Sequence, residues 1–75
     1  MLVEERMKQI ALAKLSAFHD IDATLSRDEV GLPVYILKID EHYSRIYPNT
    51  KLLTIEGLET AVDRAISAFR MEAFN

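Results

Sequence analysis

The sequence contains no cysteine and no tryptophan, only two glycines and two prolines, and no long uninterrupted apolar run. Without cysteine the chain can form neither a disulfide framework nor a thiolate metal site. Its first fifteen residues, MLVEERMKQIALAKL, carry acids among the first five and lack the apolar segment of a signal peptide or a transmembrane helix. We therefore expect a cytoplasmic protein and a complete small gene product.

An excess of basic residues is also missing. Nine Lys and Arg stand against twelve Asp and Glu, which gives a formal charge of −3. This balance argues against general affinity for a phosphate backbone, because such binding needs clustered cations. The sequence has no Gly-rich phosphate loop, no GxSxG motif and no HExxH motif. We predict a non-enzymatic protein with no cofactor and no metal.

What the chain does contain is enough apolar material for one packed core. Its 75 residues are 49% hydrophobic, above the level of disordered chains. We expect a single small domain over residues 1–75, which buries only about 60–65% of its unfolded surface and gains from a partner.

Residues 54–74 form the clearest predicted element, an amphipathic helix. Thr54 suits the N-cap, Glu56 and Glu59 lie near the positive end of the helix dipole, and Arg70 lies near the negative end. Apolar residues recur at spacings of three and four and predict one buried stripe. They are Leu58, Ala61, Val62, Ala65, Ile66, Phe69 and Ala73.

Residues 2–18 predict a second helix, rich in strong helix formers. Its expected stripe consists of Val3, Met7, Ile10, Ala11, Leu15 and Phe18. Leu12 lies outside that stripe, and three outcomes are open for it: ordinary exposure, a broader buried face of the helix, or contact with a second chain.

Three strands are expected between the helices. Residues 21–26 alternate apolar and polar, with Ile21, Ala23 and Leu25 on the buried side. Ser26 to Glu29 also matches a capping box, so a tight turn or a single helical turn should follow. Residues 32–39 are dense in β-branched and aromatic side chains, and residues 42–47 should form their hairpin partner. Residues 51–53 are a candidate for a further short pairing.

This order predicts an α+β fold, a two-layer αβββα sandwich in which a three-stranded antiparallel sheet carries both helices on one face. The order resembles that of the double-stranded RNA-binding domain in topology and length. That family meets phosphates with basic side chains at the start of its last helix. Glu56 and Glu59 occupy the matching turn here, so the resemblance does not imply the same function.

The outer face of the sheet depends on the hairpin register. A loop of two or four residues puts Tyr35, Leu37 and Ile39 on the core side, whereas a three-residue loop brings Tyr43, Arg45 and Tyr47 to that side. Because DEHY lacks glycine, we predict a four-residue type I loop. The outer side then shows Val34, Ile36, Lys38, Tyr43, Arg45 and Tyr47.

The two histidines offer only weak signals of chemistry. His42, beside Asp40 and Glu41, is expected at an exposed hairpin tip, where little would tune a pKa. His19 lies near the end of the first helix. Either could line a pocket at a subunit junction if the protein were an oligomeric enzyme.

The leading hypothesis is a small cytoplasmic binding protein, a bacterial or phage regulator or inhibitor of a larger protein complex. Its expected contact residues are Ile36, Lys38, Tyr43, Arg45 and Tyr47, because Tyr and Arg combine large contact areas with polar ends. The partner would be a larger protein or a second copy in a homodimer, with no membrane involved. The alternatives are an ordinary solvated sheet face and a nucleic-acid module in which the same residues stack on bases and touch phosphates.

Overall fold

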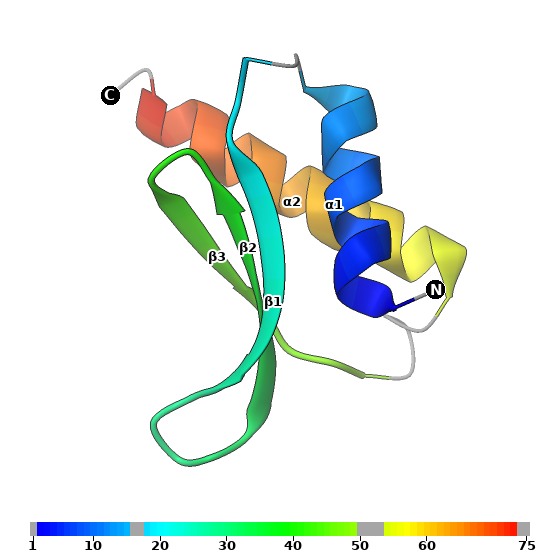
Figure 1. Ribbon diagram of the computed structural model, residues 1–75, viewed down its shortest axis with the longest axis vertical. Coiled ribbons are helices and arrows are strands. Elements are labelled where there is room, and N and C mark those ends of the chain that lie inside the picture. Colours follow the sequence, from blue (N-terminus) through cyan, green and yellow to red (C-terminus); the bar gives the residue numbers. More distant parts are fainter. Residues whose placement is uncertain (1, 16–17, 50–53, 74–75) are drawn as a thin grey trace.

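The chain folds into two helices and three strands in the order α1 (Val3–Lys14), β1 (Ile21–Arg27), β2 (Pro33–Ile39), β3 (His42–Ile46) and α2 (Ile55–Ala73). The computed structural model describes residues 2–15, 18–49 and 54–73. The strands form one antiparallel sheet with β2 in the middle (Figure 1). The α+β class and the αβββα order are those predicted.

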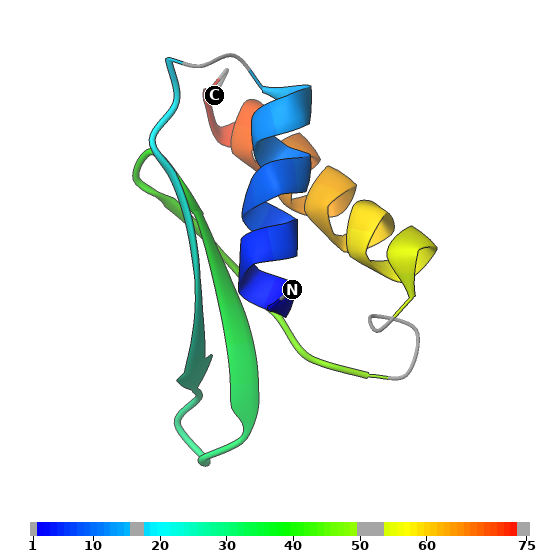
Figure 2. The ribbon, with the colours of Figure 1, turned by 45° about the vertical axis from the view of Figure 1, so that its right-hand side comes forward.

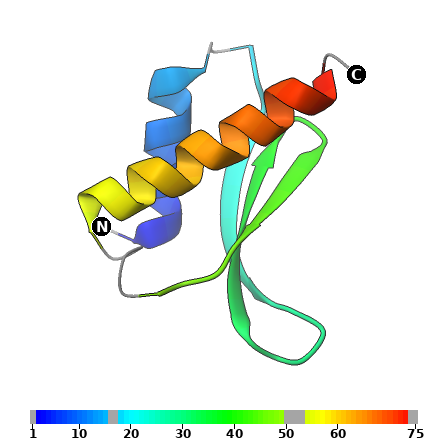
Figure 3. The same ribbon diagram turned by 180° about the vertical axis from the view of Figure 1, so that it is seen from behind.

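A single core joins the helices to the sheet. Seen from the edge of the sheet, α1 lies over the strands and α2 crosses α1 at an angle (Figure 2). The view from behind shows α2 passing across α1, with its C-terminal half beside the turn between β2 and β3 (Figure 3). The core contains Met7, Ala11, Leu15, Ile21, Ala23, Leu37, Ile39, Leu58, Val62, Ala65 and Ile66. These residues come from both helices and from one face of β1 and β2, so burial holds the layers together.

Helix α2 follows its predicted pattern closely. Thr54 caps it, because the Thr54 hydroxyl accepts a hydrogen bond from the Gly57 N–H at 2.9 Å. Of the predicted stripe, Leu58, Val62, Ala65 and Ile66 are buried, and Ala61 and Phe69 pack partly buried against the core.

Helix α1 is shorter than predicted. It ends at Lys14, since Leu15 turns to extended backbone with φ −109° and ψ 158°. Met7 and Ala11 are buried as expected, but Phe18 is 95% exposed. Its place in the stripe was wrong because the helical period stops before Phe18 is reached. Leu12 is exposed, so the helix does not have the broader buried face that was one of the outcomes open for it.

Strand β1 extends one residue further than predicted, and the hairpin it forms with β2 projects beyond both helices (Figure 1). Ile21 and Ala23 are buried, whereas Leu25 is 54% exposed although it lies on the same side. Its predicted burial was wrong because alternation decides only the face of the sheet on which a side chain lies. Whether that side chain is buried depends on how far the helices extend over the strand. Ser26 is part of the strand, and a turn follows instead of a helical turn.

The turn between β2 and β3 is shorter than predicted, but it holds an even number of residues, as predicted. Ile39 pairs directly with His42, so the loop holds two residues, Asp40 and Glu41, and not four. Asp40 takes up the left-handed conformation with φ 53°, which Asp tolerates better than most residues, so no glycine is needed. An even loop keeps Leu37 and Ile39 on the core side, as predicted. The candidate pairing of residues 51–53 lies outside the described residues.

Candidate functional site

The predicted contact residues share the face of the sheet opposite the core. Ile36 pairs with Arg45 and Lys38 pairs with Tyr43, and Tyr47 follows β3 two positions after Arg45. Alternation along each strand places these residues on one side. Tyr43 is 64% exposed and Tyr47 is also exposed, while Ile36 and Lys38 are half-buried. The structure therefore brings together the residues that the sequence selected, on a surface with two exposed tyrosines.

The loop between β1 and β2 holds two of these side chains in place. Arg45 donates to both carboxylate oxygens of Glu29, at 2.7 and 3.3 Å, and the Tyr47 hydroxyl donates to Asp28 Oδ2 at 3.1 Å. The Arg45 hydrogen bond lowers the pKa of the Glu29 carboxyl, and Glu29 in turn raises the pKa of Arg45. Both contacts join β3 to the loop across the central strand.

Asp28 also organises the loop itself. Its Oδ1 accepts from the backbone N–H groups of Leu32 at 2.9 Å and Val30 at 3.0 Å. Hydrogen bonding from the Leu32 N–H, followed by the Tyr47 hydroxyl, lowers the pKa of the Asp28 carboxyl. Gly31 adopts φ +86°, a conformation open to glycine at low cost. The loop is thus fixed at the side that meets Tyr47.

Val34 is the one residue predicted for the outer side of the sheet that is fully buried. It is only 1% exposed, so the prediction that it lies on the open surface was wrong. Val34 lies next to Tyr47, because Tyr35 is the partner of Ile46. The contacts from Arg45 and Tyr47 to the loop pass over β2 at this level. Val34 is therefore buried at the level where β3 is tied to the loop, which the period-2 pattern alone does not reveal.

The cations on this face are paired. The Lys38 ammonium donates to Asp20 Oδ2 at 3.0 Å, and this contact raises the pKa of Lys38. Arg45 pairs with Glu29 at 2.7 Å. Each positive charge therefore faces a carboxylate of the same chain, which weakens attraction to a phosphate backbone.

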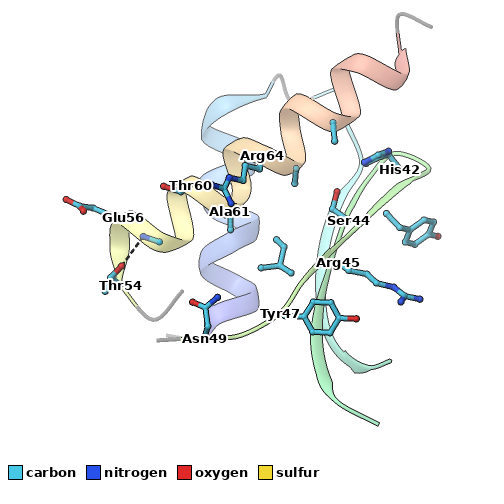
Figure 4. A pocket seen from close by; sticks show the side chains of 15 residues that line it. His42, Ser44, Arg45, Tyr47, Asn49, Thr54, Glu56, Thr60, Ala61 and Arg64 are labelled. Atoms are coloured by element: carbon cyan, nitrogen blue, oxygen red, sulfur yellow. Dashed lines mark hydrogen bonds between the residues drawn. The ribbon is translucent and has the colours of Figure 1, made fainter. Parts of the chain in front are cut away.

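A groove that the sequence did not predict lies between β3 and α2 (Figure 4). Its volume is about 940 Å³, within the range of protein ligand sites. Figure 4 shows Ser44 pointing toward α2, with Thr60, Ala61 and Arg64 on the helix side and Asn49 on the segment that follows β3. The helix wall uses small residues, namely Gly57, Ala61, Ala65 and Ala68. Their spacing of three and four in the sequence could have indicated this wall, but the same spacing is equally typical of a helix face buried in the core.

The two histidines both pack against the ring of Phe69, and His42 also lines the groove. The His42 ring stands 6.2 Å from the Phe69 ring and the His19 ring 5.3 Å from it, both edge to face. His42 Nδ1 donates to Glu72 Oε2, and its side chain is 14% exposed. The expectation of an exposed His42 was therefore wrong, because α2 returns over the hairpin turn and covers it.

Asp40 ties the turn to the segment before β1. Its carboxylate accepts from His19 Nδ1 and from the Asp20 N–H, each at 2.8 Å. The His19 contact, then the Asp20 N–H, lowers the pKa of the Asp40 carboxyl. Asp40 N–H donates to the Asp20 carbonyl at 2.7 Å. These contacts fix the end of the sheet on which α2 rests.

Residues 2–15, 18–49 and 54–73 contain no group of three or more His, Asp or Glu side chains placed to hold a metal ion. Neither of the helices seen there has the length and apolarity needed to cross a bilayer.

Among known proteins, no family model, no curated protein and no solved structure matches the chain. The likeness to the double-stranded RNA-binding domain thus consists of element order and length.

Proposed function

We propose that this chain is a small non-enzymatic binding protein that acts as a regulator or inhibitor through protein–protein contacts. The outer face of the sheet is the proposed contact surface. Its support is the exposure of Tyr43 and Tyr47 beside Ile36, Lys38 and Arg45. Tyrosines of this kind bury large areas at interfaces while keeping a polar end hydrated.

Pre-organisation adds to this proposal. Tyr47 and Arg45 are already held by Asp28 and Glu29 before any partner arrives. Ordering a mobile side chain on binding costs about 0.5–1.5 kcal/mol, and part of that cost is removed when the free protein holds the side chain in place. Such contacts lower the entropic cost of forming a defined interface.

A protein partner fits this surface better than a nucleic acid. Lys38 and Arg45 would have to supply the phosphate contacts, but Asp20 and Glu29 already pair with them. Aromatic stacking by Tyr43 and Tyr47 would remain, without the charge that normally dominates affinity for nucleic acid.

Site-specific photo-crosslinking in cells that naturally produce the chain tests the proposal. A benzophenone amino acid replaces Tyr43 and, as a control, Phe18, which is an even more exposed aromatic residue away from the sheet face. We expect Tyr43 to give a protein adduct that Phe18 does not give. The adduct yield should fall about fivefold or more when Tyr47→Ala is added, as for an interface anchor.

Two results would count against the proposal. Equal adducts at both positions would remove the preference for the sheet face. Adducts at Tyr43 that disappear on nuclease treatment would favour the nucleic-acid alternative. Sedimentation equilibrium on the purified chain then separates the two partner classes, because a homodimer doubles the mass of 8.6 kDa and a chain awaiting a different protein stays monomeric.

A further inference from the structure

The open edge of β3 offers unpaired backbone groups. Strand order makes β3 an edge strand. Residues in an antiparallel pair alternate between exchanging and not exchanging backbone hydrogen bonds, and the two-residue turn makes Ile39 and His42 a bonded pair. Leu37 with Ser44 is therefore bonded as well, and the N–H and C=O groups of Tyr43 and Arg45 point away from β2. An extended peptide can pair with such groups.

The groove lies beside this edge. Side chains from both faces of β3 line it, which places its opening along the strand edge. A strand added there would send alternate side chains under α2, where Ala61, Ala65 and Ala68 leave room. Ile46 is half-buried at the floor and offers an apolar contact.

Charge selects the occupant. Arg64 lines the groove, and no carboxylate in the described ranges lies within ion-pair distance of it. Glu56 also lines the groove, two helical turns away toward the N-terminus of α2. An acidic side chain entering near Arg64 would therefore be stabilised.

A second copy of β3 is a poor match for this groove. The strand sequence HYSRI contains Arg45 and His42 and no acid. Self-pairing along this edge would therefore leave Arg64 without a counter-charge. The observations thus favour a segment of a different protein.

We infer that an extended segment of a partner protein adds to β3 as a fourth strand. It directs an aliphatic side chain into the groove over Ile46 and, two positions along, an acidic side chain toward Arg64. The inference deepens the proposed function, on which it rests, by naming how the partner is held. The exposed sheet face would then contact the residues of the same segment that point the other way.

Selection from a display library of random linear peptides on the immobilised full chain tests this inference, with peptides of about seven residues to span β3. We expect enrichment of an acidic residue two positions from an aliphatic one. A synthetic peptide of the enriched sequence is then titrated against Thr60→Tyr, which fills the groove from an exposed helix position, and against Ser67→Tyr, which adds the same side chain outside the groove. Thr60→Tyr should weaken binding about tenfold, and Ser67→Tyr should leave it unchanged.

Charge reversal gives an independent readout. Arg64→Glu should weaken the acidic peptide about fivefold, and replacing the acid of the peptide by lysine should restore its affinity for Arg64→Glu. Circular dichroism melts of each variant confirm that the fold is kept.

Three outcomes would overturn the inference: no enrichment, full affinity for Thr60→Tyr, or no response to charge reversal. Peptides that bind Thr60→Tyr normally but no longer bind Tyr43→Ala would reject the groove as the binding site and support the sheet face. If the crosslinking experiment fails but a groove peptide is selected, the sheet face is rejected as a contact surface and the groove is kept.

Discussion

At the scale of single residues, position along the projecting hairpin decides what a leucine contributes. Leu37 and Leu25 both lie on the inner side of the sheet, but Leu37 is fully buried in the core and Leu25 extends past the helices. Truncating a buried leucine removes its transfer free energy and leaves a cavity, whereas truncating an exposed one does neither fully.

We expect Leu37→Ala to lower the free energy of unfolding by about 2–5 kcal/mol and Leu25→Ala by about 1 kcal/mol or less. Urea titration followed by circular dichroism measures both. Equal losses would mean that the hairpin end is covered in solution, for example by a second chain.

Asp40 is the residue at which pH should act. Its pKa is lowered in the folded chain, first by the His19 contact, so folding favours the ionised carboxyl. The contribution of the ionised Asp40 carboxyl to the free energy of unfolding is complete above the unfolded pKa of about 3.9. It is lost as pH falls through the lower folded pKa.

Thermal melts at pH 6 and pH 3 should therefore differ less for Asp40→Asn than for the native chain. Asn keeps an acceptor oxygen and tolerates the left-handed backbone that Asp40 adopts. Asp28 and Glu29, whose pKa values are also lowered, keep part of the acid sensitivity in this variant. Glu41→Gln, in the same turn but outside the Asp40 contacts, is the control. If Asp40→Asn melts with the native pH dependence, the Asp40 contacts do not contribute.

At the scale of elements, the cap of α2 can be tested apart from its packing. The Thr54 hydroxyl satisfies the Gly57 N–H, one of the donors that the first turn leaves unpaired. Thr54→Ala should cost about 1 kcal/mol, which corresponds to a fall in Tm of about 4–8 °C. Thr60→Ala, an exposed change inside the same helix, should stay within about 0.5 kcal/mol. A cap variant that melts like Thr60→Ala would show that α2 is held by burial alone.

The elements were predictable where a local rule decided them. The α2 stripe, its Thr54 cap and the strand over Pro33–Ile39 follow from spacing and composition, and the structure confirms them. The end of α1 and the burial of Leu25 and Val34 depend on contacts between distant segments, which a single-sequence period does not encode. The two-residue turn was missed because Asp40 took the position that glycine usually fills.

The candidate site divides in the same way. Alternation along β2 and β3 correctly grouped Ile36, Lys38 and Tyr43 on one face. The ties from Arg45 and Tyr47 to the loop join residues many positions apart and became visible only in the fold. The groove could not be predicted for another reason. Small residues on a helix are found both in a packed core and in the wall of a cleft, and only the angle between α2 and β3 shows which of the two they form.

At the scale of the whole molecule, a thin body leaves much of its backbone near solvent. The principal extents are 31 × 27 × 16 Å, so the molecule is about half as thick in one direction as in the other two. The central strand and the helix surfaces that enclose Leu37 and Val62 should be the last to open, and the free edge of β3 the first.

Amide hydrogen exchange turns this into a test of both the register and the open edge. Ser44 N–H should bond to β2, while the neighbouring Tyr43 and Arg45 N–H groups face outward. We expect Ser44 to exchange about 100-fold more slowly than Tyr43 and Arg45, and Leu37 to be slower still. The reverse alternation in β3 would mean a shifted register, in which the outward-facing amides at the edge are those of Ser44 and Ile46. Added selected peptide should then slow Tyr43 and Arg45 and leave Leu37 unchanged, since only new pairing at the edge protects those amides.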